Sequence, residues 1–159
     1  MFAIIPAVVA SNPDSDSAEA EQRYEREREF HDDRFTEDHR SANRFYPLMK
    51  AADAYFGERI DGVPADAAFL EYGCGADAYT SIHLAERGRR VVGVDLSEVA
   101  IAKAEAKVRS LGLDELVDLR VMNAEALDLA DQSFDVICGV GVIHHLKLER
   151  AFSEVARVL

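Results

Sequence analysis

Two glycines and two carboxylates near the middle of the chain have the order expected of a small-molecule cradle. Glu71 stands two residues before Gly73, Gly75 follows, and Asp95 closes the next apolar segment. Glycine has no Cβ, so the backbone at such a pair can turn sharply and approach a ligand closely. A carboxylate at the end of the next strand can accept hydrogen bonds from both hydroxyls of a ribose. Together these residues predict a nucleoside pocket, whereas the glycine pair alone would indicate only a tight turn.

Two adjacent histidines, His144 and His145, are the candidate general bases. They follow the last strand-like segment, and the loop after a parallel strand lies at the edge where ligands bind. An imidazole exchanges a proton near neutral pH, so either could accept one from an acceptor hydroxyl or amine. In the structural alternative, one imidazole caps the following helix and the other packs against it.

The remaining candidates for metal or thiol chemistry are weaker. His31 and His39 lie among aspartates, but no short-range set has the spacing of a metal centre, and we expect no metal. Cys74 and Cys138 stand far apart in apolar segments, which suits reduced cytoplasmic thiols better than a disulfide. Cys74 has no neighbouring base and is expected to fill space.

Strand and helix patterns alternate from residue 67 onward. Short strands alternating with helices predict a Rossmann-like α/β fold, a parallel sheet flanked by helices. Such a sheet would bring the glycine turn, Asp95 and the histidine pair to one edge. The expected strands are 67–72, 90–95, 116–122 and 134–140, and the expected helices are 78–86, a helix capped by Ser97 and ending at Gly112, and 149–159.

The N-terminal part differs in composition from this domain, which we place at residues 65–159. Residues 1–22 combine an apolar start with a polar, acidic stretch and are expected to form a disordered segment or linker. Residues 23–64 are expected to form a helical cap segment, with one charged helix over 24–40 and another from Ser41 to Gly57.

Charge and hydropathy exclude some partners. The 159-residue chain has a formal net charge of -12, which disfavours nucleic acids and anionic membranes. No segment approaches the roughly 18 consecutive apolar residues of a membrane span. We therefore expect a cytoplasmic protein that acts on a small molecule.

Two families of nucleotide-binding proteins fit the glycine segment. Residues 73–78, GCGADA, satisfy the G-x-G-x-x-A variant of the dinucleotide fingerprint, which would indicate an NAD(P)-dependent oxidoreductase. The same segment with Glu71 resembles the first motif of class I S-adenosylmethionine-dependent methyltransferases. Glu71 favours the second family, because a carboxylate suits a cationic cofactor better than a pyrophosphate. NAEAL at 123–127 and SFDVICGVGVIHHL at 133–146 also resemble segments of that family.

This resemblance covers about 67–159 and implies a methyltransferase that uses S-adenosyl-L-methionine and a small-molecule acceptor. It assigns each part of the cofactor to residues of this chain. The methionine part falls to Glu71, Gly73 and Gly75, the ribose to Asp95, the adenine face to Leu96, the adenine edge to Asn123, Ala124 and Glu125, and the methyl-donor end to the backbone of 139–142, including Val140.

The chain departs from the family pattern in two places. Asp77 stands where many members have a third glycine, and its carboxylate would lie near that of the cofactor and weaken binding. The family sheet has seven strands, and this sequence supplies four, with 3-2-1-4 as the implied order and an apparent truncation after the fourth. Strand 134–140 would then be an open edge able to pair with another chain. A catalytically inactive cofactor-binding fragment or partner subunit therefore stays an alternative.

Overall fold

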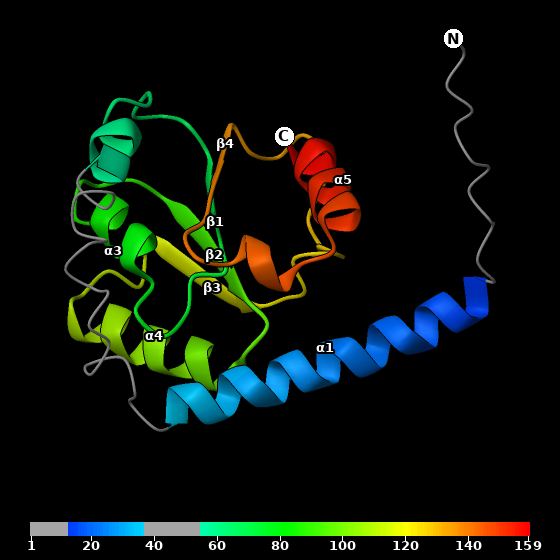
Figure 1. Cartoon of the computed structure of the whole chain (residues 1–159). Helices are drawn as coiled ribbons and strands as arrows, with labels where there is room; N and C mark the ends of the chain where they lie inside the picture. Colours follow the sequence, from blue (N-terminus) through cyan, green and yellow to red (C-terminus); the bar gives the residue numbers. More distant parts are fainter. Residues whose placement is uncertain (1–12, 37–54) are drawn as a thin grey trace, which may run out of the picture.

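The centre of the molecule is a parallel sheet of four strands (Figure 1). The computed structural model describes residues 13–36 and 55–159. The order of the strands is β3-β2-β1-β4, which confirms the predicted Rossmann-like fold and the 3-2-1-4 arrangement. The strands are β1 (Phe69–Tyr72), β2 (Val91–Asp95), β3 (Val117–Val121) and β4 (Val136–Cys138).

Strand β1 occupies the middle of the sheet and is buried along its whole length. Leu70 pairs with Val92 of β2 on one side and with Ile137 of β4 on the other. Strand β4 is shorter than the expected 134–140. It ends at Cys138 because the chain then turns through Gly139 and Gly141, the latter with a φ of 73°. Within the described part of the chain, β4 pairs with β1 alone.

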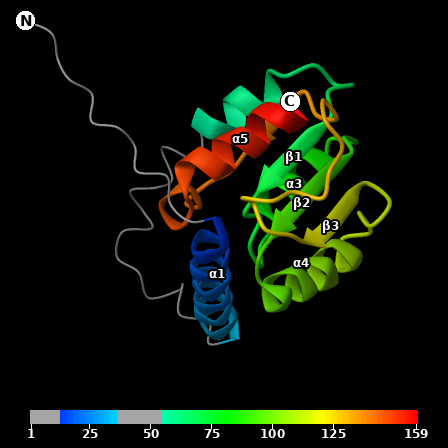
Figure 2. The ribbon, with the colours of Figure 1, turned by 90° about the vertical axis from the view of Figure 1, so that its right-hand side faces the viewer.

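Helices cover both faces of the sheet, and Figure 2 shows the sheet between α4 and α5. The helices α3 (Tyr79–Ala85) and α4 (Glu98–Ser110) lie on one face, where Ile82, Ile101 and Val108 share a core cluster. The helix α5 (Leu148–Val158) packs on the other face against Leu70 and Tyr72. Helix coverage of both faces explains why the central strands are almost continuously apolar.

The chain N-terminal to the sheet is more helical than the sequence indicated. Helix α1 (Pro13–Thr36) begins inside the segment that we expected to be disordered. Proline is favoured at the first helical position and alanine and glutamate are good helix formers, so residues 13–22 can continue into the charged helix. A second helix spans 55–61 and includes Gly57, which therefore does not end it. The predicted start of that helix at Ser41 lies outside the described residues.

No helix within residues 13–36 and 55–159 is both long enough and apolar enough to cross a bilayer. The longest, α1, has 24 residues, but charged side chains dominate it.

Candidate functional site

The glycine turn after β1 is packed so closely that a Cβ added to Gly73 would clash with a neighbouring side chain. Gly73 and Gly75 have φ values of 70° and 59°, in the left-handed region that favours glycine. The backbone N–H groups of Gly73 and Cys74 donate to the carbonyl oxygen of Val94, at 2.8 and 3.0 Å. A Cβ on Gly73 would lie 2.6 Å from Cγ2 of Val142, in the loop after β4. The turn is therefore fixed between the ends of β2 and β4.

Glu71 is held by the protein's own donors. Its side chain is buried beneath α3, where Oε1 accepts from the backbone N–H of Thr80 at 3.1 Å. Oε2 accepts from the N–H and the hydroxyl of Ser81, at 2.8 and 2.6 Å. Burial raises the pKa of Glu71, although these hydrogen bonds work against that shift. The structure thus gives Glu71 a part in fixing the start of α3, and its contact with a ligand stays a prediction.

Asp95 links the glycine turn to the start of α4. Its Oδ2 accepts from the backbone N–H of Gly75 at 2.8 Å, and its Oδ1 accepts from that of Ser97 at 2.9 Å. Each carboxylate oxygen can accept a second hydrogen bond, and the side chain is half-buried at the carboxyl edge of the sheet. Leu96, also half-buried, follows it at the same edge.

The segment after β3 forms a compact turn that other elements hold in place. Oδ1 of Asn123 accepts from the backbone N–H of Glu125 at 2.9 Å, and a bridge pairs Asn123 with Ala126. The carbonyl of Ala124 accepts a hydrogen bond from the hydroxyl of Tyr72, at the end of β1. Tyr72 was not among the predicted site residues, although a polar aromatic residue at the end of a buried strand signals such a contact.

Both carboxylate oxygens of Glu125 are fully used. Oε1 accepts from Arg23 at 2.7 Å and from the backbone N–H of Lys147 at 2.8 Å. Oε2 accepts from Arg23 at 2.7 Å and from the Tyr24 hydroxyl at 2.9 Å. Burial opposes ionisation, yet these hydrogen bonds hold the pKa of Glu125 below its ordinary value. The adenine contact that the resemblance implied for Glu125 stays a prediction, while in the structure its carboxylate holds the turn after β3 against α1.

Helix α1 lies across the carboxyl ends of the strands, which Figure 2 shows from the side. The middle of the helix contacts the turn after β3 through Arg23 and Tyr24. Further along, Asp32 accepts hydrogen bonds from the hydroxyl of Ser97 and from the backbone N–H of Val99, the latter at 3.4 Å. We expected a charged helix in a helical cap segment and did not predict these contacts. The sequence around its charged residues does not show which distant residues they will contact.

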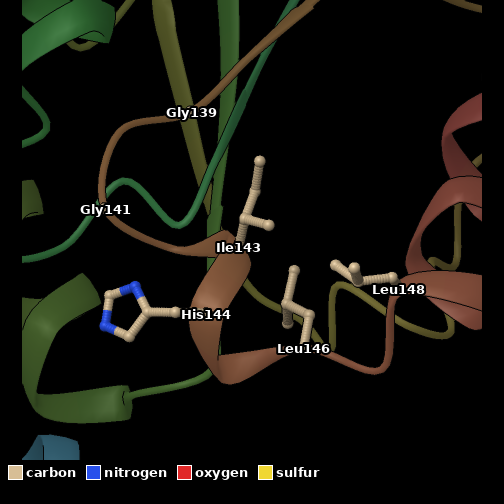
Figure 3. A pocket seen from close by; sticks show the side chains of 6 residues that line it. All are labelled: Gly139, Gly141, Ile143, His144, Leu146 and Leu148. Atoms are coloured by element: carbon tan, nitrogen blue, oxygen red, sulfur yellow. The ribbon is translucent and has the colours of Figure 1, made fainter.

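A cavity of about 450 Å³ opens beside the loop after β4. Figure 3 shows the side chains of Ile143, Leu146 and Leu148 on one side of the short 3-10 helix η2 (Ile143–His145), with His144 projecting from the other. The cavity is lined by Gly139, Gly141, Ile143, His144, Leu146 and Leu148. Apolar side chains therefore dominate a site next to the glycine turn.

The structure separates the predicted residues of this loop. His144 is exposed and lines the cavity. The ring of His145 turns toward α1, where its Nδ1 lies 3.0 Å from Oε2 of Glu27. Val140 is 49% exposed and is not among the residues that line the cavity.

Asp77, at the position where many family members have a third glycine, does not have a left-handed backbone. That conformation falls on the next residue, Ala78, with a φ of 40°. Oδ1 of Asp77 lies 3.1 Å from Nζ of Lys107 on α4. The lysine ammonium offsets part of the repulsion that we expected between Asp77 and an anionic ligand group.

Both cysteines are free and buried. Burial raises the pKa of Cys74, and it raises that of Cys138 to about 12. Neither thiol is therefore ionised near neutral pH, which agrees with a packing role for Cys74.

The strand order, the glycine turn after β1 and the carboxylate that ends β2 together define a Rossmann-like domain of the class I methyltransferase type. The chain belongs to the methyltransferase domain family, whose model matches residues 70–159. The resemblance drawn from the sequence is thereby confirmed, and the oxidoreductase interpretation gains no support.

Two curated relatives and one solved structure show the extent of the similarity. A ubiquinone biosynthesis O-methyltransferase of Parvibaculum lavamentivorans is 38% identical over 124 residues, which are 70% of this chain and 48% of that protein. A phosphatidylethanolamine N-methyltransferase of Cereibacter sphaeroides is 36% identical over 56% of this chain and 43% of its own length. The chain thus spans less than half the length of both relatives.

The solved structure is a geranyl diphosphate C-methyltransferase from Streptomyces coelicolor, crystallised with Mg²⁺, geranyl diphosphate and S-adenosyl-L-homocysteine. It matches with a TM-score of 0.61 and 25% identity over 70% of this chain and 42% of that one.

Proposed function

We propose that this chain binds S-adenosyl-L-methionine at the carboxyl edge of its sheet and uses it to methylate a small-molecule acceptor. The observation that carries the proposal is the Asp95 carboxylate, which joins the glycine turn to α4 and keeps one acceptor position on each oxygen. A ribose presents two hydroxyl donors to such a group. Membership of the methyltransferase domain family supports this choice of ligand over a dinucleotide.

The residues around the turn fit the rest of this cofactor. Glycine at position 73 lets the turn pack against Val142, and this packing fixes the backbone at the edge where the methionine part would bind. The amide N–H₂ of Asn123 and the segment at Ala124 would face the adenine edge, with Leu96 against the adenine face. Glu125 would act as a positioning residue, because its hydrogen bonds hold this segment against α1 and Lys147.

When bound, the cofactor would supply a methyl group from its sulfonium, and the rest of the cofactor would leave as a neutral thioether. The chain's own residues position the acceptor and exclude water. The apolar cavity beside η2 suits an acceptor with a hydrocarbon part. His144, exposed at this cavity, would accept the proton of an acceptor hydroxyl or amine.

Calorimetric titration of the purified chain tests the proposal. S-adenosylmethionine and S-adenosylhomocysteine should both bind with one site per chain, and NADH and NADPH should give no heat. Circular dichroism would show that the sample is folded. Flat heats with both adenosyl compounds for a folded sample would contradict the proposal, and NAD(P)H binding would favour the oxidoreductase.

A second candidate is a cofactor-binding fragment or partner subunit that does not turn over. Two observations favour it. The chain covers less than half the length of each of the two relatives, and β4 pairs only with β1 in the described sheet. Cofactor binding without product across a panel of acceptors would support it. Sedimentation analysis would show whether two copies associate, as an open β4 edge would allow.

Three further expectations concern the location of the protein, its substrate class and its domain organisation. We place the protein in the cytoplasm, in line with its two free cysteines. We expect no nucleic-acid substrate, because the net charge is -12. We also keep the division into an N-terminal segment, a helical cap segment and a cofactor-binding domain from residue 65, now with α1 reaching back to Pro13.

A further inference from the structure

Three side chains that could bind a metal meet where α1 passes the turn after β4. Glu27 and His31 lie four residues apart on α1 and therefore share a face of the helix. His145 belongs to η2, and 118 positions separate it from Glu27 in the sequence. One ligand atom from each residue lies within 4.8 Å of the other two. Local spacing around His31 gives no sign of this cluster, because its third member is distant in the sequence.

The distances within the cluster are close to those of a metal centre. Oε2 of Glu27 lies 3.0 Å from Nδ1 of His145 and 3.8 Å from Nε2 of His31. Zinc bonds to imidazole nitrogen and carboxylate oxygen are about 2.0–2.2 Å, so a tetrahedral ion holds its ligand atoms roughly 3.3 Å apart. The three atoms lie within 4.8 Å of one another, so binding requires side-chain rotations that bring the wider pairs to that spacing.

The donor set selects the class of ion. Two imidazoles with one carboxylate suit zinc and neighbouring divalent transition metals, whereas Mg²⁺ and Ca²⁺ prefer oxygen ligands. Both histidine side chains are 22% exposed and Glu27 is 31% exposed, so an ion can enter from solvent.

The surroundings hold the two imidazoles in place. The rings of His31 and His145 meet edge to face, with centroids 4.7 Å apart. The ring of Phe35 stacks on His31 at 6.1 Å, and that of Phe30 lies 6.5 Å from His145. Arg23 fixes the backbone of the turn by donating to the carbonyl oxygen of His145 at 3.2 Å. Rotamers restricted in this way reduce the entropy cost of forming a site.

We propose that Glu27, His31 and His145 bind one divalent transition-metal ion, with Zn²⁺ as the best match, and leave a fourth position to water. The ion fastens α1 to the turn after β4 and so stabilises the helix across the carboxyl edge of the sheet. The alternative is a hydrogen-bonded contact between Glu27 and His145 that binds no metal. This inference is independent of the methyl-transfer proposal.

Titration of the untagged, chelator-treated full chain with Zn²⁺ distinguishes the two. We expect one ion per chain and a rise in the melting temperature. Co²⁺ in place of Zn²⁺ should give the visible absorption bands of a four- or five-coordinate ion. A folded wild-type chain that binds neither ion would overturn the proposal, and so would a sulfur-to-cobalt charge-transfer band, which would assign the ion to a cysteine.

Single substitutions locate the site. His31→Ala and His145→Ala should each weaken Zn²⁺ binding at least about tenfold, and Glu27→Gln should do the same while preserving the size of the side chain. The matched control is His83→Ala, because His83 pairs with Asp61 at 2.9 Å on another part of the surface. Unchanged affinity in the folded His31 and His145 variants, or an equal loss in the His83 variant, would refute the assignment. The cobalt spectrum of the wild-type chain decides the question if the variants do not fold.

Discussion

The backbone N–H of Gly75 donates to Oδ2 of Asp95 at 2.8 Å, and this hydrogen bond joins the turn after β1 to the end of β2. The same carboxylate accepts from Ser97 through its other oxygen. One side chain therefore shapes the loop and also presents the acceptor atoms to a ligand. The effects of changing it should appear both in stability and in ligand affinity.

Asp95→Ala should lower the affinity for S-adenosylhomocysteine at least about tenfold, because each lost hydrogen bond to a charged group stabilises by roughly 1.5–3 kcal/mol. Calorimetry on the folded variant measures the change. Asp118→Ala is the control, since Asp118 is an exposed carboxylate on β3 that pairs with Arg120 at 2.6 Å. Wild-type affinity in the Asp95 variant would remove the main support for the ribose contact.

Gly73→Ala should destabilise the fold by about 2–4 kcal/mol. Part of the cost is the left-handed backbone, and the rest is the contact of the new Cβ with Val142, 2.6 Å away. Denaturant unfolding measures it.

Gly88→Ala separates these two parts of the cost. Gly88 has a φ of 78°, and a Cβ added there would meet nothing within 4 Å, so this variant should lose only about 1–2 kcal/mol. Adding Val142→Ala to Gly73→Ala should restore part of the stability. Equal losses in the two glycine variants would show that the packing against Val142 does not matter.

Glu125→Gln should destabilise the protein at neutral pH and make little difference in acid. The folded-state pKa of Glu125 lies below its ordinary value, so its ionised form adds stability above the unfolded pKa of about 4.3, and this stability is lost as the pH falls through the folded value. Unfolding curves of both proteins from pH 7 downward should converge. A difference that stays constant with pH would mean that the charge of Glu125 contributes nothing.

His144→Ala should reduce methyl transfer about a hundredfold or more once an acceptor is found, without changing the affinity for S-adenosylhomocysteine. His83→Ala, on the surface of α3, serves as the control. If the His144→Ala variant lost cofactor affinity together with activity, His144 would instead have a structural role.

The sequence predicted the elements of the sheet because their patterns are local. The glycines of the turn, the Ser97 cap and the apolar strands each reflect the chemistry of a few neighbouring residues. The start of helix α1 was predicted less accurately than the strands. Its N-terminal turns are acidic and poor in apolar residues, so composition predicted disorder where favourable helix propensity continues the helix.

The polar contacts of the site were not predictable in the same way. Glu71 has the residue type of a ligand contact, yet its hydrogen bonds go to Thr80 and Ser81 at the start of α3. Glu125 was predicted with its neighbours to contact adenine, but its partner Arg23 lies 102 positions away. A carboxylate does not reveal from its own position which donor will satisfy it.

Periodicity and turn chemistry are local, so they predicted the strands, the helices and the edge of the sheet where the glycine turn and Asp95 meet. The family and the strand order came from the resemblance of the motifs to class I methyltransferases. Which carboxylates remain open to a ligand, and which are held by α1 and α3, emerged only with the fold. The reason is that a buried charge must find its hydrogen-bond partners, and folding brings those partners from distant parts of the chain.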